Sequence, residues 1–136
     1  MWLLTNNTFT TAADAKYTAT EIRPNVYGII SPFYGRPTPE NKGWNSNSYF
    51  LVSGQGVLVF DTGSSEAIGE SILRTIRTVT DKPIRWVVNS HSHADHRLGN
   101  AVFAELGAEI ISTESAIATM KLDGKGDAKA FSRMTA

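Results

Sequence analysis

A short apolar run and the polar segment that follows it constrain the fold of this chain more than any other feature. Residues 84–88 read Ile-Arg-Trp-Val-Val, which is typical of a buried β-strand, and residues 89–100 follow directly. The polar segment holds every histidine of the chain with an aspartate among them: His91, His93, Asp95 and His96. Imidazole and carboxylate groups suit zinc and related divalent ions. The sequence therefore predicts a metal site where a strand ends, the usual place for ligand-bearing loops in α/β proteins.

The spacing of these residues predicts how they divide between ions. His91 and His93 are two positions apart, and an extended or looped backbone sends such side chains to the same side, so both rings can meet one ion. Asp95 and His96 are adjacent and offset from that pair. They fit a second ion a few ångströms away, as in two-metal sites.

The amino-terminal part of the chain predicts strands. Residues 21–30 are partly β-branched and predict one strand, interrupted at Pro24. Residues 31–43 hold three prolines and two glycines and predict a loop. Residues 49–53 and 57–61 predict two strands of a hairpin, joined by Gly-Gln-Gly. Three aromatic residues in and after the loop either line a pocket or pack onto the core: Phe33, Tyr34 and Trp44.

A helix is predicted next, because Ser64 or Ser65 can cap its first turn and Glu66 is favourable there. Four apolar residues recur at helical spacing and predict one buried stripe: Ile68, Ile72, Ile76 and Val79. Pro83 ends this pattern before the next strand.

The carboxyl-terminal part predicts helix, strand and helix. The helices cover residues 95–107 and 113–122, with a strand over 108–112 between them. Residues 123–136 are polar and glycine-rich and predict a loop or a frayed end. This alternation indicates an α/β fold in which helices cover a sheet.

Three segments resemble one known superfamily. His-Ser-His-Ala-Asp-His at residues 91–96 fits the HxHxDH signature of the metallo-β-lactamase-fold hydrolases. Residues 47–52 resemble the early Asn-Ser-Tyr strand of that superfamily, and residues 57–63 resemble its apolar strand ending in Asp-Thr-Gly. Gly99-Asn100 stands where the family often has a glycine pair. The resemblance implies a metallo-β-lactamase-like αββα sandwich, of which this chain resembles the N-terminal half.

The resemblance also implies domain limits and an activity. Residues 21–136 would form the half-domain. Residues 1–20 are expected from composition to be a loosely ordered leader, because residues 5–20 are rich in Thr, Asn and Ala. The family's chemistry is hydrolysis by metal-activated hydroxide, which attacks an ester, thioester, lactone or β-lactam carbonyl in a small-molecule substrate. One or two Zn²⁺ ions would be bound, the first by His91 and His93 and the second by Asp95 and His96. Asp95 would also orient the hydroxide or accept a proton.

Several alternatives stay open. A mononuclear Fe²⁺ dioxygenase of the same fold and a non-catalytic metal-binding half-domain also fit this signature. Asp61 either orients a metal ligand or is an ordinary turn residue at the end of a strand.

The family completes its metal sites with further ligands from later in the chain. No histidine follows His96, and the context of Asp123 and Asp127 does not match the family's bridging aspartate. Three explanations remain: a longer enzyme of which this is a fragment, a second chain such as another copy, or an inert half-domain. We expect the first. A bare half would expose a sheet face and edge and would tend to self-associate.

Net charge, the length of the apolar runs and the cysteine count limit the partners and ligands expected for this chain. Thirteen basic and thirteen acidic residues cancel, which gives no reason to expect nucleic acid or an anionic membrane as a partner. No apolar run approaches the length that spans a bilayer. The absence of cysteine excludes disulfides and thiolate ligands from this chain but does not distinguish a bacterial periplasm from a cytoplasm.

Overall fold

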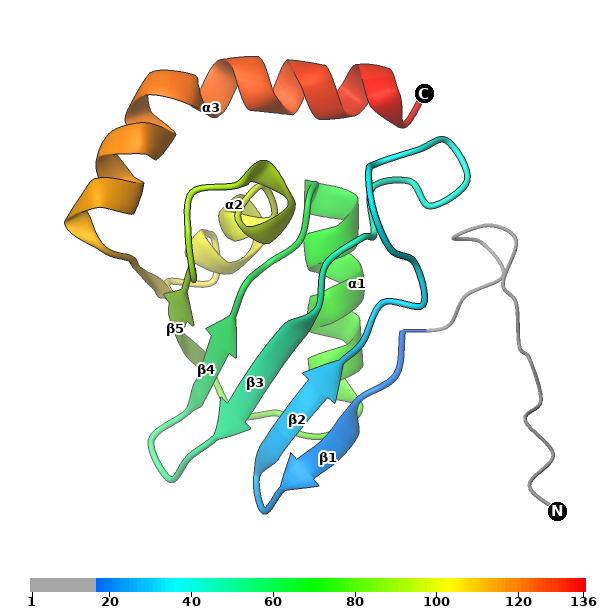
Figure 1. Ribbon diagram of the computed structural model, residues 1–136. Coiled ribbons are helices and arrows are strands. Elements are labelled where there is room, and N and C mark those ends of the chain that lie inside the picture. Colours follow the sequence, from blue (N-terminus) through cyan, green and yellow to red (C-terminus); the bar gives the residue numbers. More distant parts are fainter. Residues whose placement is uncertain (1–16) are drawn as a thin grey trace, which may run out of the picture.

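The computed structural model describes residues 17–136, which form one six-stranded sheet with helices packed on it (Figure 1). Strand order in the sheet follows chain order. The strands are β1 (Thr20–Arg23), β2 (Val26–Ile29), β3 (Ser48–Val52), β4 (Val57–Phe60), β5 (Ile84–Val88) and β6 (Glu109–Ile111). Strands β1 to β4 pair antiparallel, whereas β4–β5 and β5–β6 pair parallel. The predicted α/β class is confirmed.

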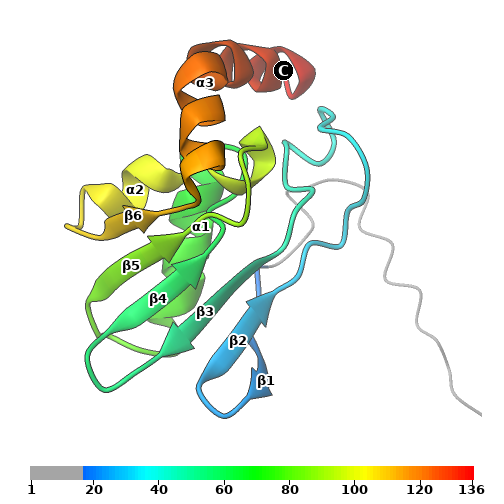
Figure 2. The same ribbon diagram turned by 60° about the vertical axis from the view of Figure 1, so that its left-hand side comes forward.

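The helices take different positions around this sheet. They are α1 (Glu66–Arg77), a single 3₁₀ turn (Ala94–His96), α2 (Asn100–Ala104) and α3 (Glu114–Met134). Helices α1 and α2 cover one face, while α3 crosses beyond the end of the sheet toward which β4 points (Figures 1 and 2). Within residues 17–136, none of the helices combines the length and apolar character that crossing a bilayer requires.

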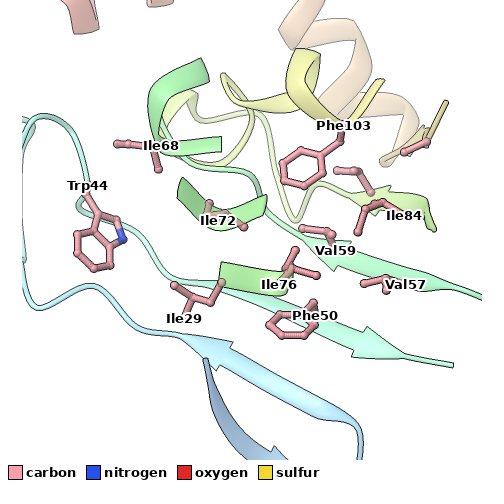
Figure 3. Packing of buried hydrophobic residues seen from close by; sticks show 12 residues of the cluster. Ile29, Trp44, Phe50, Val57, Val59, Ile68, Ile72, Ile76, Ile84 and Phe103 are labelled. Atoms are coloured by element: carbon pink, nitrogen blue, oxygen red, sulfur yellow. The ribbon is translucent and has the colours of Figure 1, made fainter. Parts of the chain in front are cut away.

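The core lies between the sheet and α1. Ile72 and Ile76 belong to one buried cluster with Phe50 of β3 and Val59 of β4 (Figure 3). The Ser65 side chain accepts a hydrogen bond from the Ile68 amide, so the predicted cap and most of the predicted stripe are confirmed. Val79 is the exception, since it is 37% exposed. It lies beyond Arg77, where α1 ends, and so does not share the buried face.

The opposite face of the sheet is not covered by any helix of residues 17–136 (Figure 2). Register places Tyr49, Phe60, Val88 and Ile111 in one row across β3 to β6. Side chains alternate between faces along a strand, so this row points away from α1 and α2. Phe60 is 36% exposed and Ile111 38% exposed. Because isolated domains rarely leave such a surface open, this face is suited to contact with another protein segment.

Two predictions about the amino-terminal part need refinement. The expected strand over 21–30 is a hairpin of β1 and β2, and the turn at Pro24 and Asn25 places Asn25 at φ 65°. Most of the leader predicted over residues 1–20 lies outside the described residues. Tyr17, which is described, stacks on Trp44 with 3.7 Å between ring centroids and so belongs to the folded domain.

The helix expected over 95–107 is divided in the structure. The His96 carbonyl accepts a hydrogen bond from the Thr62 amide at 2.9 Å, and the Gly99 amide donates to Gly63 at 3.3 Å. These bonds to the end of β4 replace bonds that a continuous helix would make. A 3₁₀ turn and the short α2 result.

The last helix was expected to end near Leu122, which is wrong. Helix α3 continues to Met134 through Gly124 and Gly126. Each internal glycine costs about 1 kcal/mol relative to alanine, so local propensity predicts a loop there. Contacts from α3 to the rest of the fold, among them the Arg97–Asp127 ion pair, offset that cost.

Candidate metal centre

The histidine segment leaves β5 and is held at both ends by paired asparagines. The Asn89 side chain donates to Asn100 Oδ1 at 3.0 Å, and Asn100 donates back to Asn89 Oδ1 at 2.7 Å. Thr62 Oγ1 also donates to Asn100 Oδ1 at 2.8 Å. A Cβ on Gly99 would lie 2.1 Å from the Thr62 carbonyl oxygen, so only glycine fits there. These contacts fix the loop. The family motifs included Thr62 and Asn100, but the sequence pattern assigned this role to neither of them, nor to Asn89.

The three imidazoles gather at the end of the sheet. Ring centroids are 4.5 Å apart for His91 and His93 and 4.2 Å apart for His91 and His96. His93 is exposed, whereas His91 and His96 are partly buried. Asp95 Oδ2 lies 3.5 Å from His96 Nε2. The structure thus brings together all four residues that the sequence singled out.

Asp61 connects this group to the end of β4. Its side chain is 5% exposed, and its Oδ2 lies 2.8 Å from His96 Nδ1. The amide and the hydroxyl of Ser90 also donate to the Asp61 carboxylate, each at 2.8 Å. A carboxylate at Nδ1 holds the ring proton there, which leaves Nε2 as the free lone pair on the side of Asp95. Asp61 therefore orients the His96 ring.

The surroundings of His91 and His96 shift the pKa values of these two rings in opposite directions. Burial lowers the pKa of His91, and the neighbouring charges of His96 and His93 lower it further. Burial also lowers the pKa of His96, but the hydrogen bond to Asp61 and the charge of Asp95 outweigh it and raise that pKa overall. Metal binding requires neutral imidazole, so His91 is more readily available for it than His96.

A second loop supports Asp95 and forms a hollow beside it. Asn45 Nδ2 lies 3.4 Å from Asp95 Oδ2, and Ser46 Oγ donates to the Asp95 carbonyl. The hollow has a volume of about 330 Å³. It is lined by Phe33, Tyr34, Asn45, Ser46, Asn47, Tyr49, Asp61 and His96. The three aromatic residues were expected either to line a pocket or to pack onto the core, and each expectation holds in part. Phe33 and Tyr34 line the hollow, whereas Trp44 is 2% exposed and lies in the core.

The imidazole and carboxylate groups are donors of the type that a divalent transition ion takes, but there are too few of them. Imidazole and carboxylate are suitable ligands, yet catalytic zinc normally takes three protein ligands and a water. Within residues 17–136, no group of three or more His, Cys, Asp or Glu side chains is arranged to hold one ion. The described residues therefore provide part of a metal site.

Comparison with known proteins identifies the family. The model of the Metallo-beta-lactamase superfamily matches residues 41–132. The chain belongs to the metallo-β-lactamase superfamily. Metallo-beta-lactamase IND-1 from Chryseobacterium indologenes is 30% identical over 101 residues, which cover 74% of this chain and 40% of that protein. A linear primary-alkylsulfatase from Pseudomonas sp. is 37% identical over 49 residues, covering 36% of this chain and 9% of that protein.

Solved metallo-β-lactamase structures share the fold. A metallo-β-lactamase from Cronobacter sakazakii with a HARLDQ motif matches with a TM-score of 0.62 and 24% identity, covering 85% of this chain and 39% of that one. FIM-1 from Pseudomonas aeruginosa, solved in its mono-zinc form, matches with a TM-score of 0.64 and 21% identity, covering 81% and 47%. This metallo-β-lactamase-fold chain spans less than half the length of each of these relatives.

Proposed function

We propose that this chain provides part of the ligand set for the zinc ions of a hydrolase of the metallo-β-lactamase superfamily. One observation supports the proposal above all: three imidazoles lie together while Asp61 holds His96 Nδ1 at 2.8 Å. That arrangement leaves nitrogen lone pairs for a cation. A bound zinc ion lowers the pKa of its water to about 7 and so supplies hydroxide near neutral pH. The substrate is a small molecule with an ester, thioester, lactone or β-lactam carbonyl.

The chain's own residues have separate roles in this proposal. His91 and His93 contribute to one ion, and Asp95 with His96 to a second. Asp95 also accepts a proton or orients the attacking oxygen, since Asn45 and Ser46 hold its side chain and its carbonyl. The neighbouring hollow, with its aromatic wall, has room for a small substrate beside His96.

The remaining ligands come, in this proposal, from a second half-domain that packs on the uncovered sheet face. The exposed apolar row there, which includes Phe60 and Ile111, supports a partner at that surface. The limited coverage of the relatives supports the same idea, since this chain covers only 40% of IND-1. Either another polypeptide segment or a second copy of this chain is compatible with that surface.

Metal analysis of the purified chain tests the proposal. After dialysis against Zn²⁺ or Fe²⁺, we expect zinc to be retained in preference to iron, with weak affinity because each ion has two ligands from this chain. His93→Ala should abolish zinc retention, whereas Asp123→Asn, a change in a nearby acidic residue on α3, should not. Preference for iron would favour the dioxygenase, and binding of neither metal would favour an inert half-domain.

Activity provides the second test. We expect slow turnover of a β-lactam, a thioester, a lactone and an aryl ester by the isolated chain, because its ligands are incomplete. Rapid turnover that survives His93→Ala would refute the proposed site.

A further inference from the structure

Helix α3 lies beside the histidine loop (residues 89–100), although few of its side chains are buried. A hollow of about 270 Å³ lies between them. It is lined by Ser92, His93, Ala94 and Asp95 of the loop and by Thr119, Asp123, Asp127 and Phe131 of α3. Of the 21 residues of α3, Ala116 alone is buried, and two glycines weaken the middle of the helix. Its position over the loop therefore depends on specific polar contacts.

Arg97 makes the principal contact between loop and helix. Its side chain is 8% exposed. Nε donates to the Ser92 carbonyl at 2.6 Å, while Nη2 pairs with Asp127 Oδ2. Ser92 is the residue between His91 and His93. One planar guanidinium thus connects the backbone between two candidate ligands to the second half of α3.

We propose that Arg97 and Asp127 are positioning residues that couple the order of α3 to the placement of His91 and His93. The relevance of this coupling to metal binding rests on the function proposed above, but the coupling itself does not. A buried guanidinium needs all its hydrogen-bond partners, because leaving a buried charged group unpaired costs more free energy than leaving a neutral group unpaired. Arginine satisfies Ser92 and Asp127 together through its rigid fork, which the point charge of lysine does not reproduce. Loss of either partner therefore frees the loop and the helix together.

Hydrogen exchange in the full chain tests the coupling. In Asp127→Asn and in Arg97→Lys, we expect amide exchange over residues 90–97 and 123–134 to accelerate by about tenfold or more, because charge-assisted bonds are lost. Asp127→Glu should restore much of the protection. Asp123→Asn, one turn earlier on the same wall, and Glu70→Gln, in an exposed ion pair with Arg74 on α1, should leave both segments unchanged.

Imidazole NMR separates positioning from simple structural support. We expect the ring nitrogen resonances of His91 and His93 to shift or broaden in Asp127→Asn and to return in Asp127→Glu. A variant that loses stability throughout but leaves these rings and the loop amides unchanged would overturn the proposal. Zinc titration is a separate arm: we expect a loss of affinity of about tenfold in Asp127→Asn. If the wild-type chain binds no zinc, the proposed function fails, while the exchange and imidazole results still decide the coupling.

Discussion

Replacing Asp61 by asparagine tests the link between β4 and the histidine loop. Asparagine occupies nearly the same volume and accepts a left-handed backbone, so the φ of 62° at this position is tolerated. Its oxygen can still accept from the Ser90 amide, and the Ser90 hydroxyl can rotate to accept from the new NH₂ group. His96 Nδ1 has no such freedom, because it faces a donor where an acceptor stood. The ring proton must then move to Nε2, the nitrogen proposed to bind metal.

The size of the effect follows from these contacts. Three charge-assisted hydrogen bonds to a side chain that is 5% exposed become neutral ones, which should cost about 2 kcal/mol of unfolding free energy. Because Nε2 carries the proton in the variant, zinc affinity should fall by about 10- to 100-fold, as for other residues that orient metal ligands.

Urea denaturation and competitive zinc titration measure the two effects separately. Asp81→Asn is a matched control, since Asp81 is exposed in the loop before β5 and the same charge is removed. It should change neither quantity appreciably. If Asp61→Asn loses stability but binds zinc as tightly as the wild type, Asp61 is only a turn residue and the orienting role is refuted.

Three further predictions concern packing, pH and association. Gly126→Ala should stabilise the chain by about 1 kcal/mol in urea denaturation, because nothing lies within 4 Å of the new Cβ, whereas Gly99→Ala should destabilise it by about 3 kcal/mol. The raised pKa of His96 stabilises the chelator-treated chain fully below about pH 6.5, and that contribution is lost as pH rises through the folded pKa. Unfolding measured at about pH 5.5 and about pH 8 checks this sign. Phe60→Asp should weaken concentration-dependent self-association in sedimentation velocity without unfolding the chain.

Local pattern determined much of this protein. The strand Ile84–Val88 and the helix Glu66–Arg77 follow from apolar spacing and from the Ser65 cap, both of which involve near neighbours in the chain. The clustering of the histidines is also local, since three of them fall within six residues. The superfamily signature lies in that same segment and predicted the family correctly.

Tertiary structure alone decided the rest. Asp61 meets His96 across 35 residues of sequence, and Arg97 meets Asp127 across 30. No periodicity encodes such pairs, because they exist only after β4 and β5 align and α3 returns to the loop. The same contacts explain why α3 continues through two glycines that locally favour a loop. Propensity is a difference of about 1 kcal/mol per residue, and a few contacts between distant residues are enough to reverse it.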